Sequence, residues 1–142
     1  MKIVDLNVLL YVVNKDAAHH ETLLEWWRRA LDGDETMGLP WIVVLGFLRI
    51  ATHPRAFPRP LEPHTAVSVI DDWLELANVT LVKEKDGHWK TLRTVMNHTG
   101  TAGNLTTDAH LAVLAMTHDA ALVSCDHDFR RFKGLRLENP LD

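Results

Sequence analysis

Aspartates occur at three places in the sequence where a buried element starts or ends. Asp5 follows the apolar run at residues 3–4, and Asp126 follows the run at residues 121–124. Asp108 lies at the start of an Ala- and Leu-rich segment, where the dipole of a helix favours an anion. Several carboxylates cannot stay ionised together without a counter-charge, and Mg²⁺ or Mn²⁺ takes such oxygen ligands. The three aspartates predict a site for one or two divalent cations, which can bind phosphate and activate water.

Each of these aspartates also has a simpler interpretation. Aspartate is a good N-cap, so Asp5 could serve only to cap the helix that follows it. Asp128 lies two positions beyond Asp126 and could be a metal ligand, a support for the ligands, or the cap of the turn at residues 129–131. The equivalent placement of three acids favours the metal site over three separate caps.

Short apolar strands alternate with helices of about a dozen residues along the whole chain. The apolar patterns predict strands at residues 3–5, 36–39, 79–82, 121–124 and 135–137, and helices after Asp5 and at residues 19–31, 41–52, 64–76, 87–98 and 109–118. Loops are expected at residues 53–63, which hold four prolines, and at residues 100–108. This alternation predicts an α/β fold with a mostly parallel sheet flanked by helices. The carboxyl ends of its strands share one edge, where the acids can converge.

The bulk composition narrows the class of protein. With 142 residues the chain is expected to form a single domain over residues 1–142. A net charge of −4 argues against a generally basic nucleic-acid coat but not against a nuclease whose acids hold cations. The single cysteine, Cys125, excludes an internal disulfide and fits a reducing cytosol. No stretch approaches the roughly 18 apolar residues of a membrane span, so we expect a cytoplasmic protein with no membrane contact.

Four stretches of the sequence, in order, resemble the motifs of PIN domains, the metal-dependent ribonucleases, and in particular the VapC toxins of the mycobacterial type. They lie at residues 4–11, 39–54, 103–112 and 124–129, and residues 134–135 and 139–141 resemble the C-terminus of that group. The similarity spans essentially the whole chain. It implies a PIN-like fold.

The resemblance also implies roles for individual residues. Asp5, Asp108 and Asp126 correspond to metal-binding acids for Mg²⁺ or Mn²⁺, and Asp128 to a helper that draws a proton from the attacking water. The activity implied is that of an endoribonuclease toxin that leaves a 3′-hydroxyl and a 5′-phosphate on RNA. The implied partners are a second copy of the chain, forming a homodimer, and a VapB-type antitoxin whose tail could block the metal site.

One departure from the family keeps a second interpretation open. Most of the family has a glutamate where this chain has Gly46, and a missing carboxylate should weaken a second metal site. A PIN-like module that binds RNA or a partner without cleaving is therefore the alternative. A phosphatase of the haloacid-dehalogenase type also begins with an aspartate at a strand end, but it needs a second acid where this chain has Asn7.

Other residues carry weaker indications. The nine histidines suggest zinc, most densely at His19-His20-Glu21, but no HExxH or CxxC spacing supports a zinc site. Cys125 as a nucleophile would need a base and an orienting group. Arg49, beside the proline-rich loop, could contact RNA phosphates or be an ordinary surface residue.

Overall fold

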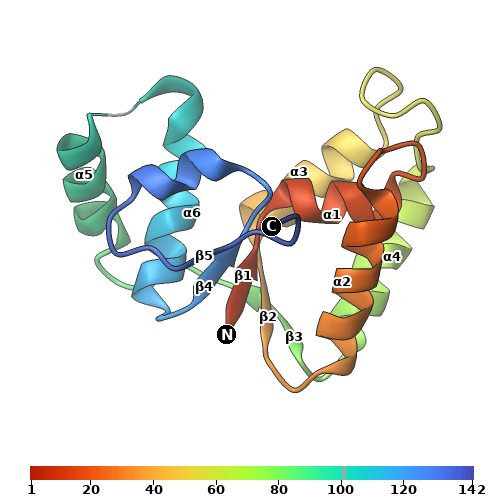
Figure 1. Ribbon diagram of the computed structural model, residues 1–142, viewed down its shortest axis with the longest axis horizontal. Coiled ribbons are helices and arrows are strands. Elements are labelled where there is room, and N and C mark those ends of the chain that lie inside the picture. Colours follow the sequence, from red (N-terminus) through yellow and green to blue (C-terminus); the bar gives the residue numbers. More distant parts are fainter. Residues whose placement is uncertain (101) are drawn as a thin grey trace.

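A five-stranded parallel sheet forms the centre of the computed structural model, which describes residues 1–100 and 102–142 (Figure 1). Its strands are β1 (Lys2–Val4), β2 (Met37–Pro40), β3 (Val79–Val82), β4 (Ala121–Val123) and β5 (Leu137–Glu138), and they lie in the order β3-β2-β1-β4-β5. In register, Ile3 of β1 lies between Gly38 of β2 and Leu122 of β4. The predicted α/β class with a parallel sheet is confirmed.

The helices cover both faces of this sheet. They are α1 (Leu6–Val13), α2 (His20–Asp32), α3 (Trp41–Ala51), α4 (Pro63–Glu75), α5 (His88–Thr99) and α6 (Thr106–Thr117), with the short 3₁₀ helices η1 (Gly103–Leu105) and η2 (His127–Arg131). The first four gather on one side and α5 and α6 on the other (Figure 1). Right-handed crossovers produce this division, because the chain moves outward from β1 to β3 and then returns across the sheet to β4.

Two predicted boundaries are wrong by two residues or more. Helix α6 begins at Thr106 rather than at residue 109, because the 3₁₀ turn η1 leads directly into it. Strand β5 starts at Leu137 rather than at residue 135, because the N–H of Leu135 donates to the carbonyl of Phe132 and keeps Leu135 in a turn. Thr101, in the loop predicted at residues 100–108, lies outside the described residues.

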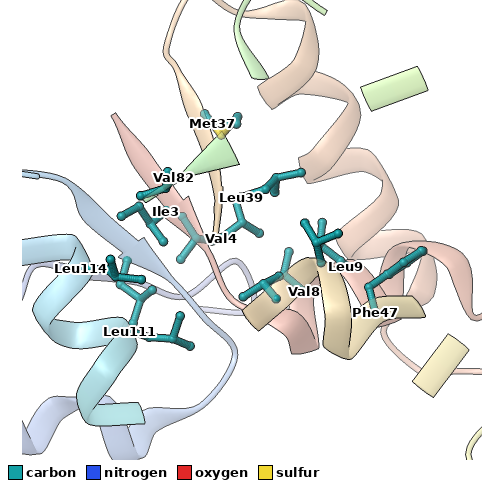
Figure 2. Packing of buried hydrophobic residues seen from close by; sticks show 14 of the residues in the cluster. Ile3, Val4, Val8, Leu9, Met37, Leu39, Phe47, Val82, Leu111 and Leu114 are labelled. Carbon is teal, nitrogen blue, oxygen red and sulfur yellow. The ribbon is translucent and has the colours of Figure 1, made fainter. Parts of the chain in front are cut away.

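Apolar side chains from both helix layers pack on the central strands. Ile3 and Val4 of β1 are fully buried, Val8 and Leu9 of α1 and Phe47 of α3 cover one face, and Leu111 and Leu114 of α6 cover the other (Figure 2). Each such side chain contributes about 1.5–3 kcal/mol of burial free energy. The short strand β1 is thereby fixed at the centre of the core, and the residue that follows it is held in place.

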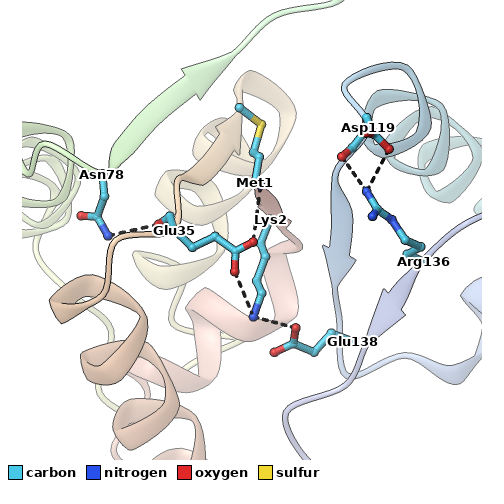
Figure 3. Close-up of polar contacts among 7 residues, drawn as sticks. All are labelled: Met1, Lys2, Glu35, Asn78, Asp119, Arg136 and Glu138. Carbon is cyan, nitrogen blue, oxygen red and sulfur yellow. Dashed lines mark hydrogen bonds and ion pairs between the residues drawn. The ribbon is translucent and has the colours of Figure 1, made fainter.

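Ion pairs join residues near the starts of β1 and β5 to neighbouring acids. Lys2 Nζ lies 2.8 Å from Glu138 Oε2 and 3.6 Å from Glu35 Oε1, and Arg136 lies 3.1 Å from Asp119 Oδ1 (Figure 3). Lys2 and Arg136 are therefore matched by acids. Within the described chain, no helix is long and apolar enough to cross a lipid bilayer.

The order of the strands marks one crevice as the natural place for a site. The chain adds β2 and then β3 on one side of β1, and β4 pairs with the other side of β1. In open α/β sheets, ligands bind beyond the carboxyl ends of strands where this direction reverses. The residues after β1 and β4, among them Asp5 and Asp126, lie at that point.

Candidate active site

Asp5 both caps a helix and faces the crevice. It follows β1, its N–H donates to the Val123 carbonyl at 2.9 Å, and its Oδ1 accepts from the N–H of Leu6 at 2.7 Å. The two interpretations of this residue are therefore compatible. The cap uses one carboxylate oxygen and leaves the other for contacts across the crevice.

A hydrogen-bonded clamp made by Ser124 and Asn7 joins the ends of β1 and β4. The buried Ser124 hydroxyl donates to Asp5 Oδ2 at 2.7 Å and accepts from the N–H of Asp126 at 3.0 Å. Asn7 Nδ2 lies 3.1 Å from both Asp5 Oδ2 and Ser124 Oγ, and Asn7 Oδ1 accepts from the N–H of Cys125 at 3.2 Å. The clamp therefore fixes Asp5 relative to the loop that carries Asp126.

The sequence alone did not single out Ser124 or Asn7 as members of the site. The available signal was their spacing, since Asn7 lies two residues after Asp5 and Ser124 two residues before Asp126. Polar side chains so close to strand-ending acids are placed to orient them.

A cavity of about 380 Å³ opens beyond the strand ends. Asp5, Asp108 and Asp126 line it together, so the three predicted metal-binding residues converge. The rest of the lining is the basic side chain of Arg49 and a mostly apolar wall. The wall is made by Leu6, Asn7, Leu10, Ile42, Val43, Gly46, Thr107 and Leu111. The arrangement joins an acidic side to an apolar side.

The crowding of acids changes their protonation. Burial raises the pKa of Asp5 to about 6, the negative charges of Asp108 and Asp126 add to this rise, and the Ser124 hydrogen bond opposes it. Burial also raises the pKa of Asp108, and the charges of Asp126 and Asp128 raise it further. Both shifts favour the neutral carboxyl until a positive charge enters the cavity.

Asp128 lies outside the cavity lining. It is exposed, its N–H donates to Asp126 Oδ1 at 2.8 Å, and its own carboxylate lies 3.8 Å from Arg131. Asp126, not Asp128, therefore caps the turn of η2. The role of Asp128 as a proton-accepting helper stays a prediction, supported by its electrostatic influence on Asp108.

The donor set fits a hard divalent cation bound partly through water. Among residues 1–100 and 102–142, no three or more His, Cys, Asp or Glu side chains form a group arranged to hold a metal ion. Mg²⁺ does not require such a cage, because it usually keeps several waters and binds one or two carboxylates. The repulsion that Asp5 receives from Asp108 and Asp126 is the electrostatic feature that a cation would relieve.

Gly46 is part of the cavity wall. A Cβ placed on this residue would lie 2.6 Å from Leu6 Cδ2, so Leu6 occupies the space that a side chain at position 46 would need. This packing makes the cavity wall apolar at the position where the resemblance implied a carboxylate.

We expect Gly46→Glu to tighten Mn²⁺ binding by about tenfold, because ligand charge strengthens cation affinity and the end of Leu6 can rotate away. Isothermal titration calorimetry on metal-free protein measures the change. Gly46→Gln is the matched control, since it displaces Leu6 equally without adding charge. Equal affinities for the two variants would contradict the expectation.

Two weaker candidates have structural explanations. Burial raises the pKa of the Cys125 thiol to about 11, and the charges of Asp5 and Asp142 add to this effect, so the thiol stays protonated near neutral pH and is a poor nucleophile. The buried His20 places Nδ1 2.8 Å from the carbonyl of Tyr11, which ties α2 to α1 rather than to a metal.

Comparisons with known proteins agree with this architecture. Residues 2–135 match the model of the PIN domain family. The chain is 44% identical to Ribonuclease VapC37 of Mycobacterium tuberculosis over 99% of this chain and 97% of that protein, and 36% identical to Ribonuclease VapC33 of the same species over 99% of each. Among solved structures, VapBC2 from Rickettsia felis, bound to a promoter DNA fragment, shares the fold with a TM-score of 0.70 at 19% identity, covering 97% of each chain. The chain belongs to the PIN-domain family, among the VapC ribonucleases.

Proposed function

We propose that this protein is a Mg²⁺- or Mn²⁺-dependent endoribonuclease and the toxin of a VapBC-type toxin–antitoxin pair. The observation that carries the proposal is the convergence of Asp5, Asp108 and Asp126 in one cavity at the carboxyl edge of the sheet. Relatives named as VapC ribonucleases, similar over nearly the whole chain, support the same activity.

The proposed reaction is hydrolysis of an RNA phosphodiester. Asp5, Asp108 and Asp126 would hold the cation, which when bound supplies positive charge at the scissile phosphate and a water of lowered pKa. Asp128, beside the cavity, accepts the proton of the attacking water, directly or through a neighbouring acid. The products would be a 3′-hydroxyl and a 5′-phosphate.

Arg49 is the residue best placed to position the substrate. It is exposed and lines the cavity, and it forms no ion pair with any residue that the structure describes. An unpaired guanidinium at the edge of an acidic cavity can bind a phosphate next to the one being cleaved. Such contacts make RNA binding weaken as salt rises.

Partners and location belong to the same proposal. The protein would act in the cytoplasm as a homodimer, silenced by a VapB-type antitoxin whose tail blocks the acidic cavity. The relatives solved as VapBC complexes, such as VapBC2 from Rickettsia felis, support the antitoxin.

Cleavage of a mixed small-RNA pool by the purified protein tests the proposal. Reactions contain Mg²⁺, Mn²⁺ or a chelator, and the products are mapped at their ends. Discrete cleavage that requires a metal and leaves 5′-phosphates is the expected result. RNA binding without cleavage under either metal would overturn the nuclease and favour the binding module, with Gly46 as its cause.

A further inference from the structure

Residues 83–93, which lead into α5 and form its first half, carry four cations that have no ion-pair partner among the described residues. Lys83, Lys85, Lys90 and Arg93 are exposed, and none forms an ion pair with another described residue. This differs from the sheet edge of Figure 3, where the drawn cations meet carboxylates. Residues 83–93 hold four cations against two acids in a chain whose net charge is −4.

Trp89 of α5 lies among these cations. Its side chain is 67% exposed, the largest exposed fraction among the large apolar residues of the described chain. Arg93 follows at the i+4 position, so both side chains project from the same face of the helix. None of the twelve residues of α5 is buried, so packing does not explain this tryptophan.

This surface lies next to the helix that carries a residue of the acidic cavity. His88, which precedes Trp89, places Nε2 2.9 Å from Nδ1 of His110 on α6. His110 comes two residues after Asp108 on the same helix, and Figure 1 shows α5 alongside α6. Helix α5 therefore contacts the same helix that carries Asp108.

We propose that Lys83, Lys85, Trp89, Lys90 and Arg93, the α5 surface, bind a single-stranded segment of the RNA substrate beyond the scissile phosphate. A base stacks on the indole of Trp89, and the lysines and Arg93 contact the flanking phosphates. Exposed aromatic rings among cations are the elements by which proteins hold single strands without sequence preference. The proposal rests on the proposed ribonuclease function and identifies a second contact region for its substrate.

Charge favours RNA over a protein as the occupant. The unpaired cations need a dense series of negative charges, which the phosphates of a single strand supply at regular intervals. The surface includes a single large exposed apolar side chain, Trp89, whereas protein interfaces bury a cluster of them. The experiment must therefore distinguish binding of RNA to the α5 surface from binding of a protein to it.

The experiment measures RNA binding in chelator, where cleavage cannot interfere. Fluorescence anisotropy follows a labelled, unstructured oligo(A) of about 20 nucleotides, longer than most single-strand sites, across a series of KCl concentrations. We expect Trp89→Ala to raise the Kd about tenfold and Trp89→Phe to restore most of the affinity, because a phenyl ring still stacks.

The double variant Lys90→Gln/Arg93→Gln tests the phosphate contacts. We expect the slope of log Kd against log salt to fall by about 1.4, the value for two lost contacts with a single strand. Its matched control, Lys15→Gln/Arg28→Gln, removes two exposed and unpaired cations elsewhere and should leave the slope unchanged. Equal losses in both double variants would mean that only net charge matters, and would overturn the proposal.

The remaining outcomes separate this inference from the proposed function. Wild-type protein that binds oligo(A) through Trp89 but cleaves no RNA contradicts the nuclease and leaves the α5 surface standing. Protein that cleaves RNA while the α5 variants bind and cleave as the parent does contradicts only the surface. Unchanged RNA binding with weakened binding to the purified antitoxin would assign α5 to a protein partner instead.

Discussion

Asp5→Asn will remove RNA cleavage and, at pH 7, make the folded protein more stable than its parent. We expect the rate to fall by about 10³-fold or more, as is usual when one member of a catalytic unit is lost. The stabilisation has an electrostatic cause. The parent buries a carboxyl whose pKa is raised to about 6 beside Asp108 and Asp126, and asparagine carries no charge there.

The direction of the pH dependence follows from that raised pKa. In the unfolded chain the Asp5 pKa is about 3.9, so between pH 4 and 6 the folded state binds more protons than the unfolded state. The parent therefore loses stability as pH rises through this window. The variant avoids that loss. Weaker contacts with Ser124 offset part of the benefit, so the net gain in the free energy of unfolding is about 1–2 kcal/mol at pH 7.

Urea unfolding at pH 4 and pH 7 measures the effect. The stability gain of Asp5→Asn should be present at pH 7 and absent at pH 4. Asp34→Asn, an exposed aspartate outside the acidic cavity, is the control and should change neither stability nor cleavage. A variant that cleaves RNA, or that is less stable than the parent at both pH values, would contradict the assignment of Asp5.

Ser124→Ala will lower cleavage by about 10–100-fold, the usual loss when a group that orients a metal ligand is removed. The hydroxyl donates to Asp5 Oδ2 and lowers the Asp5 pKa, so its removal raises that pKa further above the ordinary range. The N–H of Asp126 loses its acceptor at the same time. Ser124 is a positioning residue, and its loss affects both acids.

The pH profile of cleavage separates this role from a loss of fold. The acid limb of kcat/KM should move to higher pH in Ser124→Ala, because Asp5 must lose its proton before a cation can bind. Ser124→Thr keeps the hydroxyl and should restore the limb, and Ser68→Ala on the exposed side of α4 should leave it unmoved. A slower rate with an unmoved limb would contradict the proposed role.

The fold class and the acids were predictable because both depend on local patterns. Alternating apolar runs and helical stripes fix the order of elements, and an aspartate after an apolar run lies at the carboxyl edge of a parallel sheet. The structure brings Asp5, Asp108 and Asp126 to one cavity as these patterns predict.

The contacts between distant segments were not predictable in the same way. The bond between Asn7 and Ser124 joins residues 117 positions apart, and it exists because β4 pairs with β1. Alternation of elements does not specify which strands are neighbours. For the same reason the packing of Leu6 over Gly46, and the unburied face of α5, appear only once the helices are placed on the sheet.

The pairing of β1 with β4 has a consequence for the time at which a nascent chain becomes active. Asp5 emerges from the ribosome well before β4, but its carboxylate gains its Ser124 partner only after β4 has emerged and inserted beside β1. Such non-local pairings form late and slowly in folding. The acidic cavity therefore cannot be complete on the ribosome until β4 has been made, although Asp5 itself is exposed much earlier.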